Sequence, residues 1–369
     1  MNEDKLYWIG VNMVRGIGAV RFRQLLEYFG DAKTAWHASD SQLRAAGLSE
    51  KIIQNWHLMR NGVDLSVIGS KLDTHGITTL TWDDPQYPRR LHEIEQPPPV
   101  LYVRGTLTEA DEWAVAIVGT RRVTTYGRQV TEQLATALAQ NGVTIISGLA
   151  RGIDSIAHQT ALKTGGRTIA VLGSGHDHVY PPENKRLAED ILASGAVLSD
   201  YPPGTEPEAT NFPPRNRIIS GLAMAVVIVE ASRQSGALIT AEFAAEQGRE
   251  IFAVPNNIYA PQSQGTNWLI QQGARSMLHP QEVLEALDLG RVAQHREARM
   301  LIPANDLEAQ ILALIRNEAL HVDEISVQAQ LPIKEVSATL TMMELKGMVR
   351  QMGGMQYQAL REEQADYNI

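Results

Sequence analysis

The sequence predicts an extended, doubly wound α/β domain with a helical domain before it and a winged helix after it. Three observations support this fold class. Apolar strand candidates alternate with helical segments in the middle of the chain, helical periodicity dominates before them, and three short helices with a hairpin follow. The length of 369 residues suits two or three domains, and a hydrophobic content of 44% suffices for a sizeable core.

Residues 1–72 are predicted as the helical domain. Apolar residues recur there at helical spacing, in Val20, Phe22, Leu25, Leu26 and Phe29. The break Arg15-Gly16-Ile17-Gly18 comes directly before this helix.

Residues 73–288 are predicted as the α/β domain. Strand candidates at 77–82 and 100–103 lie on either side of a proline run that excludes a helix interior. Six apolar strands follow at 115–118, 143–146, 168–172, 196–198, 226–229 and 251–254. The helices between them are predicted near 126–141, 154–165, 184–194, 215–223 and 237–247. Strands that are apolar on both faces and separated by helices indicate a parallel sheet covered on both sides, with right-handed crossovers.

The rest of the chain is predicted as a polar linker at 289–304, a winged helix at 305–361 and a tail at 362–369. The first helix of the winged helix has an apolar face that includes Ile311 and Ile315. A second helix is expected at 322–330, and a third begins after Pro332. The segment 349–357 then reads as a hairpin, which completes the pattern.

Composition excludes several classes of protein. The chain has no cysteine, so disulfides, zinc–thiolate sites and cysteine nucleophiles are ruled out. No secretory signal is visible, and no apolar run approaches the roughly 20 residues of a membrane helix, so we expect a cytoplasmic protein. The net charge of −9 argues mildly against nucleic acid, but a local arginine cluster can still make a positive site.

The loops that follow the strands are the expected binding site, because open α/β sheets bind ligands at the carboxyl ends of their strands. The first loop contains Gly119, Thr120, Arg121 and Arg122. Gly119 permits a sharp turn, Thr120 offers a hydroxyl, and the two arginines can bond to phosphate oxygens. The alternative is a tight turn with solvated arginines.

The second and third loops have mainly structural explanations. Gly148 and Gly152 bracket a loop whose N–H groups suit an oxyanion, and Asp154 is predicted to cap the next helix. An acid–base pair of Asp154 with His158 is the weaker alternative. The segment 176–178 reads His-Asp-His. We interpret it as part of a turn, and a metal site is the weaker alternative.

The fourth loop is the most informative. Phe212 can stack a base, Arg215 and Arg217 can reach phosphates, and Asn211 or Asn216 can bond to phosphate or base. The alternative is a capped helix with a packed phenylalanine. In the fifth loop, Ser235 and Gly236 can present N–H groups to phosphate, and Glu242 is expected to be solvated or packed.

Taken together, these segments resemble the DprA/Smf family of DNA-processing proteins. The matching motifs are AIVGTR at 116–121, SGLARGID at 147–154, YPPEN at 180–184, NFPPRNRII at 211–219 and SGALITA at 235–241. The resemblance covers nearly the whole chain. It implies a SAM-like helical N-terminal domain, a Rossmann-like domain extended by the strands at 77–103, and a winged helix.

The resemblance also implies a function. Family members bind single-stranded DNA in a positive pocket, protect it and load a RecA-type recombinase during natural transformation, and they dimerise through the Rossmann-like domain. A single-stranded DNA-binding protein is a further candidate partner. The implied pocket residues here are Gly119, Thr120, Arg121, Gly148, Arg151, Asn211, Phe212, Arg215 and Arg217.

Two departures from the family pattern are visible. Thr120 replaces the usual serine, which preserves a hydroxyl, and Asn256 replaces the usual glycine after the sixth strand, which affects a turn outside the pocket. Arg15-Gly16-Ile17-Gly18 resembles a helix-hairpin-helix turn that holds DNA phosphates, and a plain turn in a protein-binding domain has equal weight. Because acidic residues outnumber basic ones in 305–361, we expect the winged helix to contact protein rather than duplex DNA.

The rival interpretation is an enzyme that hydrolyses nucleoside monophosphates with Glu242. Its usual glycine-rich loop is missing from 235–242. A nucleotide-sensing module is a third interpretation, and a nuclease is disfavoured because no carboxylate cluster for metal ions is evident. We therefore expect no catalytic residue, cofactor or metal.

Overall fold

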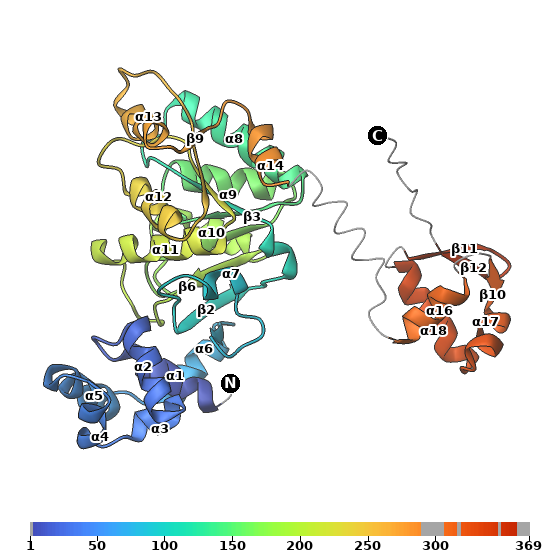
Figure 1. Cartoon of the computed structure of the whole chain (residues 1–369), viewed down its shortest axis with the longest axis horizontal. Coiled ribbons are helices and arrows are strands. Elements are labelled where there is room, and N and C mark those ends of the chain that lie inside the picture. Colours follow the sequence, from blue (N-terminus) through green and yellow to red (C-terminus); the bar gives the residue numbers. More distant parts are fainter. Residues whose placement is uncertain (1–2, 289–305, 316–318, 346–347, 360–369) are drawn as a thin grey trace. The chain divides into compact units, whose positions relative to one another are not determined.

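The computed structural model describes residues 3–288, 306–315, 319–345 and 348–359. The chain divides into two compact units, Met1–Gly290 and Arg291–Ile369 (Figure 1). The predicted linker at 289–304 and tail at 362–369 lie outside the described residues.

The first unit is built on a nine-stranded sheet with the order β1-β2-β6-β5-β4-β3-β7-β8-β9. The strands from β6 to β9 run parallel, and β1 and β2 extend the sheet, as the resemblance implies; their pairing is antiparallel. The strand bounds are β1 Thr78–Thr81, β2 Val100–Gly105, β3 Ala114–Val118, β4 Thr144–Ser147, β5 Thr168–Val171, β6 Ala196–Ser199, β7 Ala225–Ile228, β8 Glu250–Ala253 and β9 Arg275–Ser276.

The six central strands confirm the predicted ones to within one residue at either end. Their residues are almost all buried, because each strand is covered on both faces. A short helix, α7 (Arg89–His92), lies between β1 and β2.

Helices cover both faces of the sheet (Figure 1). One face carries α8 (Thr125–Gln140), α9 (Ile153–Lys163), α10 (Lys185–Ile191) and α14 (Pro280–Ala286). The other face carries α11 (Phe212–Leu222) and α12 (Gly236–Glu246), while α13 (Gln264–Gln271) follows β8. The helix α11 begins three residues before its predicted start, since Pro213 and Pro214 fit the first turn of a helix.

The chain changes direction across the sheet between β3 and β7. From β3 it winds outward through β4, β5 and β6, and then returns to place β7 on the other side of β3. The loops after β3 and β7 therefore diverge, which opens a crevice at the carboxyl ends of these neighbouring strands.

Six helices precede the sheet, with the bounds α1 Glu3–Met13, α2 Ala19–Phe29, α3 Ala32–His37, α4 Asp40–Ala45, α5 Glu50–Gly62 and α6 Leu65–Thr74. Their core includes the fully buried Phe22 and Trp56, and it is shared with Val100 and Tyr102 of β2. The helical region thus packs directly on the sheet within one compact unit. The predicted boundary at residue 72 falls inside α6.

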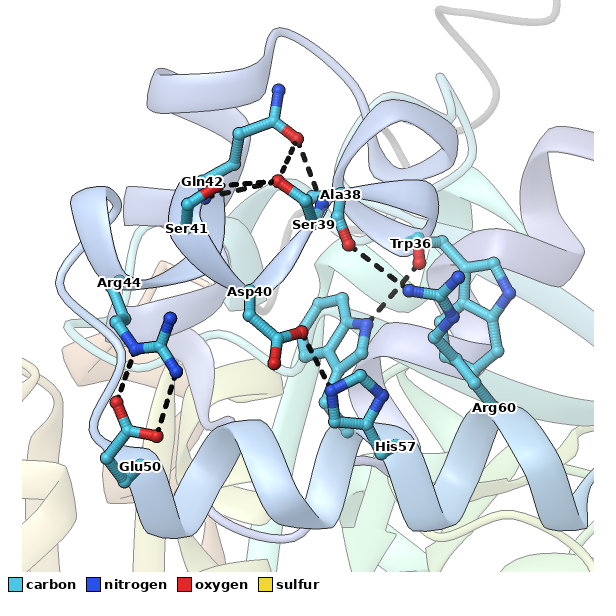
Figure 2. A network of polar contacts seen from close by, with 11 residues as sticks. Trp36, Ala38, Ser39, Asp40, Ser41, Gln42, Arg44, Glu50, His57 and Arg60 are labelled. Atoms are coloured by element: carbon cyan, nitrogen blue, oxygen red, sulfur yellow. Dashed lines mark hydrogen bonds and ion pairs between the residues drawn. The ribbon is translucent and has the colours of Figure 1, made fainter.

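A polar network fixes α3, α4 and α5 relative to one another (Figure 2). The Ser39 N–H donates to Gln42 Oε1 at 2.9 Å, which completes a capping box at the start of α4. From α5, His57 lies 2.8 Å from Asp40, and Arg60 donates to the carbonyl of Ala38 at 3.2 Å.

The second unit is a winged helix, as predicted. Its elements are α16 Asp306–Leu314, β10 Leu320–His321, α17 Val322–Ala329, α18 Ile333–Leu345, β11 Val349–Gly353 and β12 Gln356–Ala359. The three strands pair in the order β10-β12-β11 and pack on the helices around Ile325 and Leu340. In the described parts of both units, no helix has the length and apolar composition needed for a membrane span.

A buried histidine ties α9 to β4 and β5. His158 is fully buried, and its Nδ1 lies 2.6 Å from Thr168 Oγ1. The Thr168 hydroxyl donates to the carbonyl of Ile145, so it must accept the proton of His158 Nδ1. His158 Nε2 then has no hydrogen-bond partner among the described residues. Burial therefore lowers the pKa of His158 to about 3, with a further contribution from Arg215.

This histidine makes the stability of the first unit depend on pH. Because the pKa is about 3 in the folded protein and about 6.5 in the unfolded chain, the unfolded chain binds the proton first. Stability is thus complete above pH 6.5 and is lost as the pH falls. Relative to His158→Leu, we expect the wild type to lose roughly 2 kcal/mol of unfolding free energy between pH 7.5 and pH 5.

Urea unfolding followed by tryptophan fluorescence tests this expectation, since all six tryptophans lie in the first unit. If the difference in unfolding free energy between wild type and His158→Leu does not change with pH, His158 is protonated as easily in the folded protein as in the unfolded chain.

Candidate functional site

A cavity of about 630 Å³ opens at the crevice between the carboxyl ends of β3 and β7. Its walls come from the loop after β3, the loop after β7, and the first turns of α11 and α12. This is the place that the strand order and the sequence both indicate for a ligand.

Close packing determines the shape of the first loop. A Cβ atom added to Gly119 would lie 2.6 Å from Ile153 Cγ1 and 3.0 Å from the Glu230 carbonyl oxygen, so only glycine fits. The Thr120 N–H donates to the same Glu230 carbonyl at 2.7 Å, and Thr120 Oγ1 accepts from the Arg122 N–H at 3.1 Å. The hydroxyl that was predicted to face a ligand therefore also stabilises the loop.

Arg121 is the most available cation of the cavity. Its side chain is exposed and forms no ion pair with the described residues, and its guanidinium carbon lies 5.8 Å from the centre of the Phe212 ring. Arg122 is also exposed at the cavity wall. Unpaired guanidinium groups at a concave surface suit phosphate oxygens.

A buried glutamate that the sequence reasoning missed supports this loop. Glu230, only 1% exposed, follows β7 and accepts hydrogen bonds from the Thr124 N–H at 3.0 Å and the Thr124 hydroxyl at 2.5 Å. A Cβ at Gly127 would lie 2.2 Å from the Glu230 carboxylate, so α8 needs glycine there. The one available signal was an acidic residue directly after an apolar strand.

The second loop differs from its prediction at Asp154. The helix α9 begins at Ile153 with Gly152 as its N-cap, so Asp154 lies in the first turn and is not the cap. Its Oδ2 accepts from the N–H groups of Gly148 at 3.1 Å and Ala150 at 3.3 Å. These N–H groups, expected to suit an external oxyanion, are thus occupied by the protein's own carboxylate. Burial raises the pKa of Asp154, and Arg215 opposes that shift.

Arg215 has a structural role that the sequence did not indicate. It is 5% exposed and donates through Nη1 to the carbonyl groups of Gly148, at 2.9 Å, and Val171. Burial lowers its pKa to about 10, against the opposing effect of Asp154. Arg215 therefore attaches the start of α11 to the ends of β4 and β5, and a phosphate contact by this residue stays a prediction.

Phe212 is the central aromatic residue of the site. It is half-buried and lines the cavity, with its ring centre 5.7 Å from that of Tyr180 and 5.7 Å from the guanidinium carbon of Arg215. Gly148 and Arg151 line a narrower recess on the Tyr180 side. Arg151 also pairs with Glu183 at 2.5 Å.

The remaining predicted residues separate into two groups. Asn216 lines the cavity and donates to the Gly236 carbonyl at 3.3 Å. Asn211 is not in the cavity wall and donates to the Glu206 carbonyl at 3.3 Å. Arg217 is directed elsewhere, where it pairs with Asp200 at 3.0 Å.

The side chains considered for catalysis or metal binding have other positions. His158 is fully buried, and Glu242 is exposed and outside the cavity wall. His176 bonds to the Val197 carbonyl, and Asp177 accepts from the Gly204 N–H. Within the described ranges, no three histidine or acidic side chains are grouped to hold a metal ion.

Comparisons with known proteins agree with this architecture. The family model described as DNA recombination-mediator protein A matches residues 78–288, and that of the DprA winged helix domain matches residues 295–355. Protein Smf of Synechocystis is 37% identical over 97% of this chain and 99% of its own length.

Two solved structures are similar to this chain. DprA from Streptococcus pneumoniae shares 35% identity and a TM-score of 0.66 over 76% of this chain and 97% of its own. DprA from Helicobacter pylori, a structure titled for its single-stranded DNA binding mode, shares 33% identity and a TM-score of 0.52 over 57% of this chain and 95% of its own. The fold, the cavity between the carboxyl ends of β3 and β7, and the extent of these matches all agree. The chain belongs to the DNA recombination-mediator protein A family, whose members are called DprA or Smf.

Proposed function

We propose that this protein binds single-stranded DNA in the cavity between β3 and β7, protects it, and loads a RecA-type recombinase during natural transformation. The observation that carries the binding step is the exposed, unpaired Arg121 next to the half-buried ring of Phe212 in a cavity of about 630 Å³. Arg121 suits a phosphate and Phe212 suits a base. Phosphates and bases alternate regularly along a nucleic acid strand, so one strand can satisfy both side chains.

The cavity also offers a favourable electrostatic environment for phosphates. The helix α11 begins at the cavity, so the positive end of its dipole favours an anion there, while Pro213 and Pro214 in its first turn carry no N–H group. Arg121 and Arg122 add two exposed positive charges, while Asp154, the acidic residue of the wall, is buried against Arg215. A protein with net charge −9 thus presents a locally positive site.

The geometry favours a single strand over a duplex. Stacking on Phe212 requires a base whose face is free, and in duplex DNA the bases are already stacked on one another. The related protein from Helicobacter pylori is described by its single-stranded DNA binding mode, which supports the same assignment here.

The steps beyond DNA binding rest on family membership. They are recombinase loading, assembly as a homodimer through the Rossmann-like domain, contact with a single-stranded DNA-binding protein and action in the cytoplasm. For the winged helix we propose a protein-contact role, because its sequence is acidic.

Reversing the charge of Arg121 tests the binding site. We expect Arg121→Glu to weaken binding of a labelled oligo-dT at least tenfold, and to reduce the slope of log affinity against log salt by about one, because a phosphate contact is lost. Fluorescence anisotropy across a salt series measures both quantities.

Lys163→Glu is the matched control. Lys163 is exposed at the last residue of α9, at the edge of the sheet away from the cavity, so the same change of charge there should leave affinity nearly unaltered. If folded wild type and folded Arg121→Glu bind the oligo-dT with equal affinity, this cavity is not the DNA-binding site.

Phe212 gives an independent prediction. Phe212→Leu keeps an apolar side chain at the start of α11 but removes the aromatic face, so affinity for single-stranded DNA should fall by on the order of 1–3 kcal/mol. The salt dependence should not change, because no charge is altered. A normal affinity in this variant would show that the ring packs within the protein and does not stack a base.

A further inference from the structure

A second cavity, of about 500 Å³, lies between the helical region and the sheet. Three walls form it: the turn between α1 and α2, the residues Pro98 and Pro99 before β2, and the loop after β6. All of these elements belong to the same compact unit.

Arg217 lies in this second cavity and not in the first. Its guanidinium donates through Nη1 to Asp200 at 3.0 Å and through Nε to the Gln96 carbonyl at 2.9 Å. Nη2 has no hydrogen-bond partner among the described residues. Nη2 therefore keeps free donors, while Asp200, which lines the same cavity, balances part of the charge of Arg217.

The turn opposite Arg217 adds further positive groups. Arg15 is exposed and forms no ion pair within the described ranges, and Arg21 donates to the Gly16 carbonyl at 2.8 Å. The helix α2 has Gly18 as its N-cap, with no side-chain cap and no acidic residue in its first turn. Gly18 and Ala19 line the cavity, so this helix begins at its wall.

The turn has a defined shape. Gly16 adopts a φ of +102°, a conformation that favours glycine, and the Asn55 side chain donates to the Arg15 carbonyl at 2.8 Å. The backbone of the turn is thus held from α5 before any ligand arrives.

The two cavities adjoin along α11 and the segment before it. Asn216 lines the first cavity and Arg217 the second, although they are consecutive residues of one helical turn. The segment 202–209 contributes Pro207 and Ala209 to the first cavity and Pro202 and Thr205 to the second. The two cavities therefore have walls from the same segment, in which Glu206 and Glu208 are exposed.

We propose that single-stranded DNA held in the first cavity continues into the second, where Arg15, Arg217 and the start of α2 bind its backbone phosphates. This inference rests on the proposed function and adds a second contact region to it. The helical region then takes a direct part in holding the strand, with two arginines from different parts of the chain on one phosphate track.

Oligonucleotide length separates this inference from the proposed function. A dinucleotide is short enough to lie within the first cavity alone, whereas a 16-mer, of about the upper size of single-strand sites, can reach both. We expect Arg15→Glu to bind the dinucleotide like wild type but to bind the 16-mer about tenfold more weakly, with a salt slope smaller by about one. Lys163→Glu serves again as the control with the same change of charge.

The outcomes are distinct. If wild type and Arg15→Glu bind the 16-mer equally, the second contact region is wrong while binding in the first cavity stands. If Arg121→Glu binds the dinucleotide like wild type, the proposed function fails at its own site. If Arg15→Glu weakens both lengths equally, Arg15 acts on the whole protein and the inference is overturned.

A crosslinking experiment gives a second readout that does not depend on charge. Because the chain has no cysteine, Asn12→Cys introduces a single labelling site at the wall of the second cavity. A photoactivatable group attached there should crosslink the 16-mer and not the dinucleotide. Failure to crosslink a 16-mer that is bound in the first cavity would contradict the proposed path.

Discussion

Two buried charges that meet at one glycine determine the geometry of the carboxyl edge of the sheet. A Cβ at Gly148 would lie 2.8 Å from Arg215 Nη2 and 2.9 Å from Asp154 Oδ2, so the two charged groups approach the backbone where only glycine leaves room. Asp154 holds the loop after β4, and Arg215 connects that loop and β5 to α11. Each charge needs the other, because an isolated charge buried at this depth is strongly unfavourable.

Much of the fold was predictable from the sequence, since buried parallel strands leave a simple pattern. The six apolar segments lie where they were expected because both faces of each strand are covered, and the loops after them must meet at one edge. The winged helix followed from its helical periodicity and from the glycines of its hairpin. The family resemblance supplied the extension of the sheet by the strands at 77–103, while their antiparallel direction became known only from the structure.

The site was less predictable because residue type does not determine the direction of a side chain. Arginine is rarely buried, so Arg215 looked like a phosphate ligand and not like part of the scaffold. Arg217 is two positions further along the same helix, which turns by about 200° over that step, so it faces another cavity. Glu230 and Asp154 are acidic residues at strand and helix ends, where a solvated side chain or a simple cap is the usual outcome.

The shared core between the helical region and β2 has a consequence for how a strand is held. Val100 and Tyr102 are fully buried in the core that β2 shares with the N-terminal helices, so the helical region and the sheet pack as one compact unit. The distance between the two cavities is then a property of the protein and not of its ligand. A flexible strand that spans both must adopt the path that the protein offers, and almost all of the conformational freedom lost on binding is lost by the DNA.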